Sequence, residues 1–202
     1  MKVDLNKFKN RTVNVCGRTL YRESSILVPL VERADGYSLL FEVRSENLTQ
    51  QPSEICFPGG RIENLEENVK AAVRETSEEL LIPGNTIEVS GELDTLVTPF
   101  STLIYPFIGI LHNYKDTYNT DEVKEIFYVP VSYLMEAEPL CHYIDIEMKP
   151  GEDFPYEMIQ EGRNYPWAKG RYPVYFYTYG DRIIWGITAR ITYNFIEVLK
   201  HL

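Results

Sequence analysis

Three glutamates stand close together in a segment whose apolar residues have helical spacing. Glu75 precedes Glu78 and Glu79 by three and four residues, and on a helix these spacings bring side chains together. Such carboxylates repel one another and cost stability unless a cation lies among them. Clustered oxygen ligands suit Mg²⁺ or Mn²⁺, which neutralise a diphosphate and lower the pKa of a bound water so that it attacks phosphorus. The spacing therefore predicts a divalent-metal site, whereas composition alone would favour a solvated charged face.

The elements around the glutamates must hold them in place. The apolar face of the predicted helix consists of Val69, Ala72, Val73, Thr76 and Leu80. Before the helix, residues 57–60 (Phe-Pro-Gly-Gly) predict a tight turn, whose glycines let a metal ion or a phosphate approach the backbone. After it, Pro83 and Gly84 predict the end of the helix, because proline cannot continue the hydrogen-bond ladder.

Residues 60–82 resemble the Nudix box, Gly-x5-Glu-x7-Arg-Glu-U-x-Glu-Glu-x-Gly-U, where U is apolar. The matching positions are Gly60, Glu66, Arg74, Glu75, Glu78 and Glu79. Thr76 departs from the pattern at an apolar position, and Leu81 replaces the closing glycine. The glycine change implies a differently shaped helix end and leaves the metal ligands intact.

The resemblance implies a role for each matching residue. Glu75, Glu78 and Glu79 are expected to bind Mg²⁺ or Mn²⁺, with Glu75 and Glu78 also counted as catalytic. Arg74 and Glu66 are expected to orient them through a charged network, as outer partners of metal ligands do, and Gly60 is also counted as an orienting residue. Nudix enzymes often recruit a further carboxylate from a loop beyond the box. The candidates here are Glu122 and Glu125, and Glu122 is preferred as the catalytic residue.

Flanking segments are similar to the coenzyme A pyrophosphatases within that family. Their signature before the box reads Leu-Leu-Thr-x-Arg-Ser/Ala-x3-Arg-x3-Gly-x3-Phe-Pro-Gly-Gly, and Leu40, Arg44, Ser45 and residues 57–60 fit it. Residues 96–99, 106–109, 121–131 and 184–189 continue the likeness. The resemblance implies cleavage of coenzyme A or its derivatives to 4′-phosphopantetheine and adenosine 3′,5′-bisphosphate, with Arg44 and Gly59 contacting the substrate.

Several departures from this signature keep other functions open. Thr49 replaces its second arginine, Ser53 its glycine, and Glu42 its threonine, and threonine cannot replace a bidentate arginine on a phosphate. A Nudix hydrolase of ADP-ribose or of a nicotinamide dinucleotide is therefore the main alternative. A nucleotide-binding module without catalysis would lack box glutamates, and none is lost here. An isomerase of prenyl diphosphates would want a catalytic cysteine, for which only Cys56 is suggestive.

The order of predicted elements indicates an α+β fold. Strands are expected at 25–31, 37–43, 87–97, 104–112, 125–129, 141–148 and 171–177, with a hairpin turn at residues 34–36 and a last helix at 185–199. Buried positions of that helix are Ile187, Ile191, Phe195 and Val198. The family resemblance implies an α/β/α sandwich with a mixed central sheet. We expect one domain over 1–202, with an N-terminal arm or helix at 1–24 and an acidic, tyrosine-rich variable region at 139–182.

The charge and cysteine content limit the partners. The formal net charge of −10 argues against a nucleic-acid polymer and favours a small nucleotide substrate. Residues 113–162 contain twelve acidic and three basic residues, which predicts a solvated acidic lobe. No apolar run suits a membrane span or a signal peptide. Cys16, Cys56 and Cys141 lack metal-ligand spacing, so free thiols in the cytoplasm are expected. A homodimer is possible.

Overall fold

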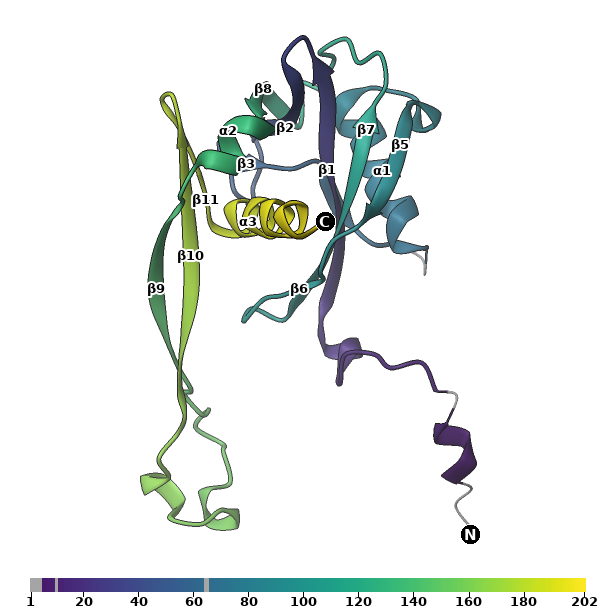
Figure 1. The fold of residues 1–202 in the computed structure, drawn as a ribbon. Helices are drawn as coiled ribbons and strands as arrows, with labels where there is room; N and C mark the ends of the chain where they lie inside the picture. Colours follow the sequence, from purple (N-terminus) through teal and green to yellow (C-terminus); the bar gives the residue numbers. More distant parts are fainter. Residues whose placement is uncertain (1–4, 10, 64–65) are drawn as a thin grey trace.

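A mixed β-sheet forms the centre of the structure, a computed structural model that describes residues 5–9, 11–63 and 66–202 (Figure 1). Its strands are β1 (Arg22–Arg33), β2 (Gly36–Arg44), β3 (Ile55–Cys56), β4 (Gly59–Arg61), β5 (Ile87–Glu92), β6 (Leu96–Val97), β7 (Thr102–Leu111) and β8 (Val123–Pro130). The order β3-β2-β1-β7-β5 runs across the sheet, while β4 pairs with β1, β6 with β7 and β8 with β2. β1 and β7 are parallel, and the other pairs of this sheet are antiparallel.

Two long helices cover opposite faces of this sheet. Side chains alternate between the faces of a strand, so Leu27 and Leu40 lie on one face and Val28 and Leu39 on the other. Helix α1 (Asn68–Leu80) packs in the cluster that contains Leu27 and Leu40. Helix α3 (Gly186–His201) packs with Val28 and Leu39. The expected α+β fold with helices on both sides of a mixed sheet is confirmed.

Most strands and the last helix follow the sequence predictions. The single strand expected at 87–97 was wrong, because residues 93–95 leave the ladder and divide it into β5 and β6, which both pair with β7. β1 and β2 pair as an antiparallel hairpin that turns between Arg33 and Gly36, as predicted. In α3, Ile191 and Phe195 are buried, and Ile187 and Val198 are partly buried against the same core. A short helix, α2 (Val131–Glu136), follows β8. Within the described ranges, no helix combines the length and apolar character of a bilayer crossing.

The region from 139 to 182 forms a second sheet. Its strands are β9 (Leu140–Glu147), β10 (Lys169–Tyr179) and β11 (Arg182–Trp185), in the order β11-β10-β9. The β9–β10 hairpin projects beyond the central sheet, and its far end holds two short 3-10 turns, Tyr156–Met158 and Gly162–Asn164 (Figure 1). At its base, Tyr177 and Ile184 join the core around α3. The predicted strands of this region are confirmed.

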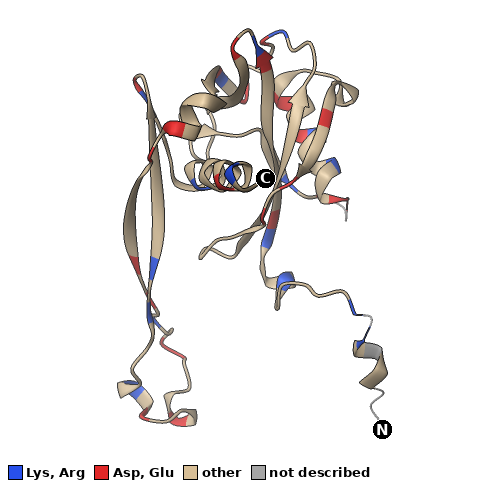
Figure 2. Ribbon diagram, viewed as in Figure 1, with Lys and Arg blue, Asp and Glu red and all other residues tan. Residues whose placement is uncertain are grey.

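The acidic stretch is not one solvated lobe. Its residues extend from the loop before β8 to the tip of the β9–β10 hairpin, and Lys and Arg positions are interspersed with Asp and Glu positions along that hairpin (Figure 2). Glu147 pairs with Lys169 and Asp145 with Arg171 across the hairpin. Lys169 and Arg171 come after residues 113–162 in the sequence. The net charge of that stretch alone therefore overstated the local excess of negative charge.

The N-terminal segment is an arm rather than a long helix. It contains two 3-10 turns, Leu5–Phe8 and Arg18–Leu20, and β1 begins at Arg22, two residues before the predicted end of the arm. Residues 1–4 and 10 of the predicted arm lie outside the described residues. The three cysteines are free, as expected, and Cys16 and Cys141 are exposed.

Helix α1 ends earlier than predicted. It stops at Leu80, because Leu81 adopts the left-handed conformation (φ 53°, ψ 45°) and its N–H donates to the carbonyl of Ser77. The prediction of an end at Pro83 and Gly84 was therefore wrong. Leu81 occupies the box position that is normally glycine, and it takes the backbone conformation that glycine adopts without strain.

Replacing Leu81 with glycine should therefore stabilise the protein. A left-handed leucine costs roughly 1 kcal/mol, and this side chain is 59% exposed, so little packing is lost. We expect the midpoint of thermal unfolding to rise by about 2–4 °C. Leu81→Ala is the matched control, since alanine keeps the backbone strain. An equal rise for both variants would contradict this explanation.

Candidate active site

The glycines at 59 and 60 allow two close approaches. A Cβ at Gly59, which has φ 151°, would lie 2.5 Å from the carbonyl oxygen of Ser25 on β1. A Cβ at Gly60 would lie 2.4 Å from a carboxylate oxygen of Glu75. The first glycine therefore lets β4 lie against β1, and the second lets the Glu75 carboxylate rest on the strand.

The three box glutamates of α1 range from buried to exposed. Glu79 is 4% exposed, and its Oε2 accepts a hydrogen bond of 2.8 Å from the Gly59 N–H. Glu75 is half-buried, and its Oε1 accepts a 2.7 Å bond from Nη1 of Arg74. Glu78 is exposed, 3.7 Å from the same nitrogen. One helix face thus presents three carboxylates beside the turn at residues 59–60.

Arg74 links these glutamates to Glu66. Its Nη2 donates to Glu66 Oε1 at 2.7 Å and to the carbonyl of Arg61 at 3.2 Å. The Glu66 carboxylate also accepts the backbone N–H of Glu63 at 3.0 Å. Hydrogen bonds to Glu66 and to the carbonyl of Arg61 therefore hold the Arg74 guanidinium while it contacts Glu75. The structure brings Glu66, Glu75 and Glu78 together around Arg74, as predicted, whereas Glu79 bonds to the Gly59 N–H instead.

The two loop carboxylates have different surroundings. Glu122 accepts a 3.3 Å bond from Asn119 Nδ2, and its charge raises the pKa of both Glu75 and Glu79. Glu125 instead forms a bidentate ion pair with Arg182, at 2.7 and 2.9 Å. Glu122 is thus within electrostatic reach of the box glutamates, whereas Glu125 is engaged elsewhere.

Burial and mutual repulsion make the box glutamates at this site harder to ionise. Burial, then the charges of Glu122 and Glu75, raise the pKa of Glu79 to about 8, although the Gly59 N–H lowers it. Burial also raises the pKa of Glu75, against the opposing effect of Arg74. Carboxylates that resist ionisation are suited to a divalent cation, which supplies the missing positive charge.

The carboxylates are not yet arranged as a metal cage. Among the described residues, no three His, Cys, Asp or Glu side chains are placed to hold one ion together. Glu79 is directed to Gly59 and Glu75 to Arg74. The donor chemistry and the charge fit Mg²⁺ or Mn²⁺, but ligation requires these side chains to reorient.

The pKa of Glu79 predicts a pH dependence of stability. Folding raises this pKa from about 4.5 to about 8, so the folded protein binds the proton more tightly than the unfolded chain. The resulting stabilisation is complete below pH 4.5 and is lost as pH rises towards 8. In EDTA, the unfolding free energy of the wild type should fall across this window relative to that of Glu79→Gln. Parallel curves for the two proteins would contradict the prediction.

Sequence reasoning missed Glu42, which was noted only as a departure from a signature. Its side chain on β2 is 1% exposed, and burial, followed by the charge of Glu79, raises its pKa. Its Oε2 lies 4.0 Å from the sulfur of Cys56, and Oε1 has no hydrogen-bond partner among the described residues. A lone charged residue inside the apolar run at 37–43 was the available signal. Burial also raises the pKa of the Cys56 thiol, so this sulfur stays protonated.

A cavity of about 780 Å³ opens beside the glycine turn. Arg44 and Gly59, the two residues predicted to contact the substrate, line it together with Gly60, Arg22 and Arg61. A second cavity of about 170 Å³ shares Arg44 and Gly59 and is lined by apolar side chains that include Ile55, Phe57 and Ile191. The site therefore offers a charged compartment beside the glutamates and an apolar compartment next to it.

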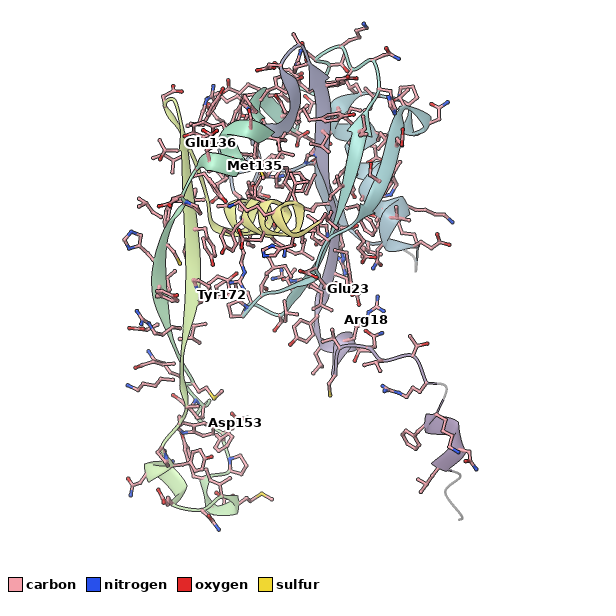
Figure 3. All side chains as sticks on the ribbon, in the orientation of Figure 1. Arg18, Glu23, Met135, Glu136, Asp153 and Tyr172 are labelled. Carbon is pink, nitrogen blue, oxygen red and sulfur yellow. The ribbon has the colours of Figure 1, made fainter. Side chains whose placement is uncertain are left out.

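The projecting hairpin reaches the edge of the larger cavity. Phe100, which lines the cavity, contacts the ring of Tyr172 of β10 with 6.4 Å between ring centroids. The guanidinium of Arg190 lies over the same tyrosine at 5.1 Å, and Figure 3 shows where Tyr172 lies on the hairpin. Tyr172 therefore packs on the protein rather than presenting a free ring face.

The fold and the box geometry agree with the family comparison. The NUDIX domain model matches residues 21–145, which is more than half of the chain. The chain belongs to the Nudix family. The curated relatives that it matches include a coenzyme A diphosphatase and Nudix hydrolases.

Two relatives indicate where the chain falls within the family. It is 36% identical over 148 residues to the peroxisomal coenzyme A diphosphatase NUDT7 of Mus musculus. That alignment covers 70% of this chain but only 62% of the mouse protein, which is less than two thirds of its length. The chain is 30% identical to the uncharacterized Nudix hydrolase NudL of Citrobacter koseri, over 93% of this chain and 88% of that protein. The predicted resemblance to this family is confirmed.

A solved structure extends the similarity of fold to nearly the whole chain. A MutT/nudix family protein from Enterococcus faecalis matches with a TM-score of 0.54 over 98% of this chain and 70% of its own. Because the identity is 14%, this comparison concerns the fold alone.

Proposed function

We propose that this protein cleaves the diphosphate of coenzyme A or its acyl derivatives, giving a phosphopantetheine and adenosine 3′,5′-bisphosphate. The observation that carries the proposal is the arginine-lined cavity at Gly59 and Gly60, the glycines that Glu79 and Glu75 contact. The resemblance of residues 40–60 to the coenzyme A pyrophosphatase signature and the identity to the mouse enzyme support it. The neighbouring apolar cavity suits the pantetheine end of such a substrate.

In the proposed reaction each residue of the site has a task. Glu75, Glu78 and Glu79 hold Mg²⁺ or Mn²⁺, while Arg74, Glu66 and Gly60 keep those carboxylates in position. The metal supplies positive charge against the diphosphate and lowers the pKa of water. Glu122 accepts the proton of the water that attacks one phosphorus in line. Arg44 and the backbone at Gly59 bind the phosphates.

The departures from the signature bear on the choice of substrate. Ser53 has φ 62°, so serine keeps the left-handed backbone for which the signature uses glycine. Thr49 is exposed and does not line the cavity, so the lost arginine is not replaced at that position. This loss favours a hydrolase of ADP-ribose or of a nicotinamide dinucleotide as the second candidate. The protonated Cys56 thiol weighs against an isomerase, and the intact box weighs against a module without catalysis.

A substrate panel distinguishes the candidates. Purified protein with Mg²⁺ or Mn²⁺ is incubated with coenzyme A, acetyl-coenzyme A, ADP-ribose and a reduced nicotinamide dinucleotide, and the products are identified by mass spectrometry. The proposal expects adenosine 3′,5′-bisphosphate from both thiol compounds at the highest kcat/KM. Turnover confined to ADP-ribose or the dinucleotide would reject it in favour of the second candidate. The cytoplasmic location and the homodimer stay predictions.

A further inference from the structure

Three arginines that lack a carboxylate partner line the larger cavity. Of the eleven arginines in the sequence, five form ion pairs, and two others, Arg163 and Arg190, lie over tyrosine rings. Among the described residues, the four without either contact are Arg11, Arg22, Arg44 and Arg61. Three of these four line the cavity, in a chain whose net charge is −10. The arginines without an ion pair or a ring contact are thus concentrated at one place in an acidic protein.

Strand register puts Arg22 and Arg61 on the same face of the sheet. Arg61 of β4 lies opposite Ser24 of β1, and paired residues share a face. Arg22 precedes Ser24 by two residues, and side chains two apart in a strand point the same way. The two arginines are therefore diagonal neighbours, a separation of roughly 7–8 Å that long side chains easily close. Their mutual repulsion is unfavourable unless an anion lies between them.

The nearest carboxylate in sequence does not neutralise Arg22. Glu23 points to the opposite face, where its Oε1 accepts a 2.6 Å bond from Nε of Arg18 and its Oε2 contacts the hydroxyl of Tyr105 (Figure 3). The Arg18 guanidinium lowers the pKa of Glu23, so this carboxylate is ionised and already paired. Arg22 and Arg61 therefore remain available to a ligand.

Arg44 belongs to another part of the cavity. It also lines the smaller cavity together with Gly59, whose N–H donates to Glu79, so it lies on the side of the box glutamates and the expected diphosphate. Arg22 and Arg61 instead stand with the hydroxyl-bearing residues Ser24 and Thr102, which line the same cavity. Arginine forks and hydroxyl groups are the usual ligands of a phosphate in proteins.

We propose that Arg22 and Arg61 bind a phosphate monoester of the substrate, separate from the diphosphate that is cleaved. This inference rests on the proposed function, since the substrate class it names is a nucleoside diphosphate derivative that also carries a ribose phosphate. The two arginines select such a substrate over its analogue without that phosphate. Their positive charge comes from β1 and β4. Thr49, which stands where the coenzyme A pyrophosphatase signature has its second arginine, carries no charge.

Equilibrium binding tests the subsite without any turnover. Isothermal titration in EDTA compares adenosine 3′,5′-bisphosphate with adenosine 5′-monophosphate, on the wild type, Arg22→Gln, Arg61→Gln and the control Arg163→Gln. Arg163 is an exposed arginine at the tip of the hairpin, outside the cavity. The wild type and the control should prefer the bisphosphate by about tenfold or more, and each cavity variant should lose most of that preference. Equal binding of both nucleotides by the wild type, or a preference kept by both cavity variants, would overturn the proposal.

Kinetics separate this proposal from the proposed function. The ratio of kcat/KM for coenzyme A to that for dephospho-coenzyme A should fall by about tenfold or more in each cavity variant. If the wild type cleaves both compounds equally well, the subsite is refuted and the diphosphatase function stands. If it cleaves neither, yet the bisphosphate preference disappears in both variants, the subsite stands and the function is rejected.

Discussion

Glu79→Gln is expected to lower kcat for the diphosphatase reaction by roughly 10³-fold or more, a loss of about 4 kcal/mol in transition-state stabilisation. Glu79 is the most buried of the box glutamates, and repulsion from Glu122 and Glu75 helps to raise its pKa. Glutamine keeps the size of the side chain and can still accept the Gly59 N–H, but it supplies no charge for a cation. The measurement is kcat at saturating substrate over a range of Mg²⁺ concentrations.

Two further glutamate-to-glutamine substitutions test whether the loss of kcat depends on the position of the carboxylate. Glu122→Gln should also reduce kcat strongly, since Glu122 is the proposed base and its charge lies within electrostatic reach of Glu75 and Glu79. Glu125→Gln removes a neighbouring carboxylate that is paired with Arg182. This variant should retain kcat within a few-fold of the wild type. A larger loss for Glu125→Gln than for Glu122→Gln would exchange the roles of the two residues.

Gly60→Ala and Gly59→Ala are expected to fail in different ways. A Cβ at Gly60 would lie 2.4 Å from the end of a flexible side chain, so the Glu75 carboxylate must move while the backbone stays. We expect kcat to fall by roughly 10²-fold, as displaced catalytic groups commonly cause, with little change in thermal stability. A Cβ at Gly59 would meet the backbone of Ser25 and Ile26 at 2.5 and 2.6 Å, with φ at 151°.

Gly59→Ala should therefore unfold at a much lower temperature, since neither β1 nor β4 can yield without loss of their pairing. The cost is of the order of several kcal/mol. Both variants are compared by thermal unfolding and, where folded, by kcat. If Gly60→Ala lost stability as severely as Gly59→Ala, the contact with Glu75 would not be the reason for glycine at position 60.

The sequence predicted the elements whose signals are local. The hairpin between β1 and β2 followed from a three-residue turn between two apolar runs, and the face of α1 followed from helical spacing. The grouping of Arg74 with Glu66 and Glu75 followed from the Nudix resemblance, and the contacts agree with it. These features need only neighbouring residues or one helix to specify them.

Features that depend on distant pairings could not be predicted in the same way. Arg22 and Arg61 come together only through the register of β1 with β4, and no spacing in the sequence shows that pairing. The different surroundings of Glu122 and Glu125 depend on Arg182, far along the chain, which pairs with Glu125. The end of α1 was misplaced because Leu81 adopts a conformation that leucine rarely takes, while proline and glycine two residues later gave a stronger local signal.

The account depends on divalent cations being held by the glutamates of α1. The direct measurement is a crystal structure with Mn²⁺ and a non-hydrolysable diphosphate analogue, in which anomalous scattering locates the metal. We predict Mn²⁺ at about 2.0–2.3 Å from carboxylate oxygens of Glu75, Glu78 and Glu79, with the analogue in the cavity that Arg44 lines. A metal bound elsewhere with those three carboxylates unchanged, or an analogue bound with no metal at α1, would contradict the account.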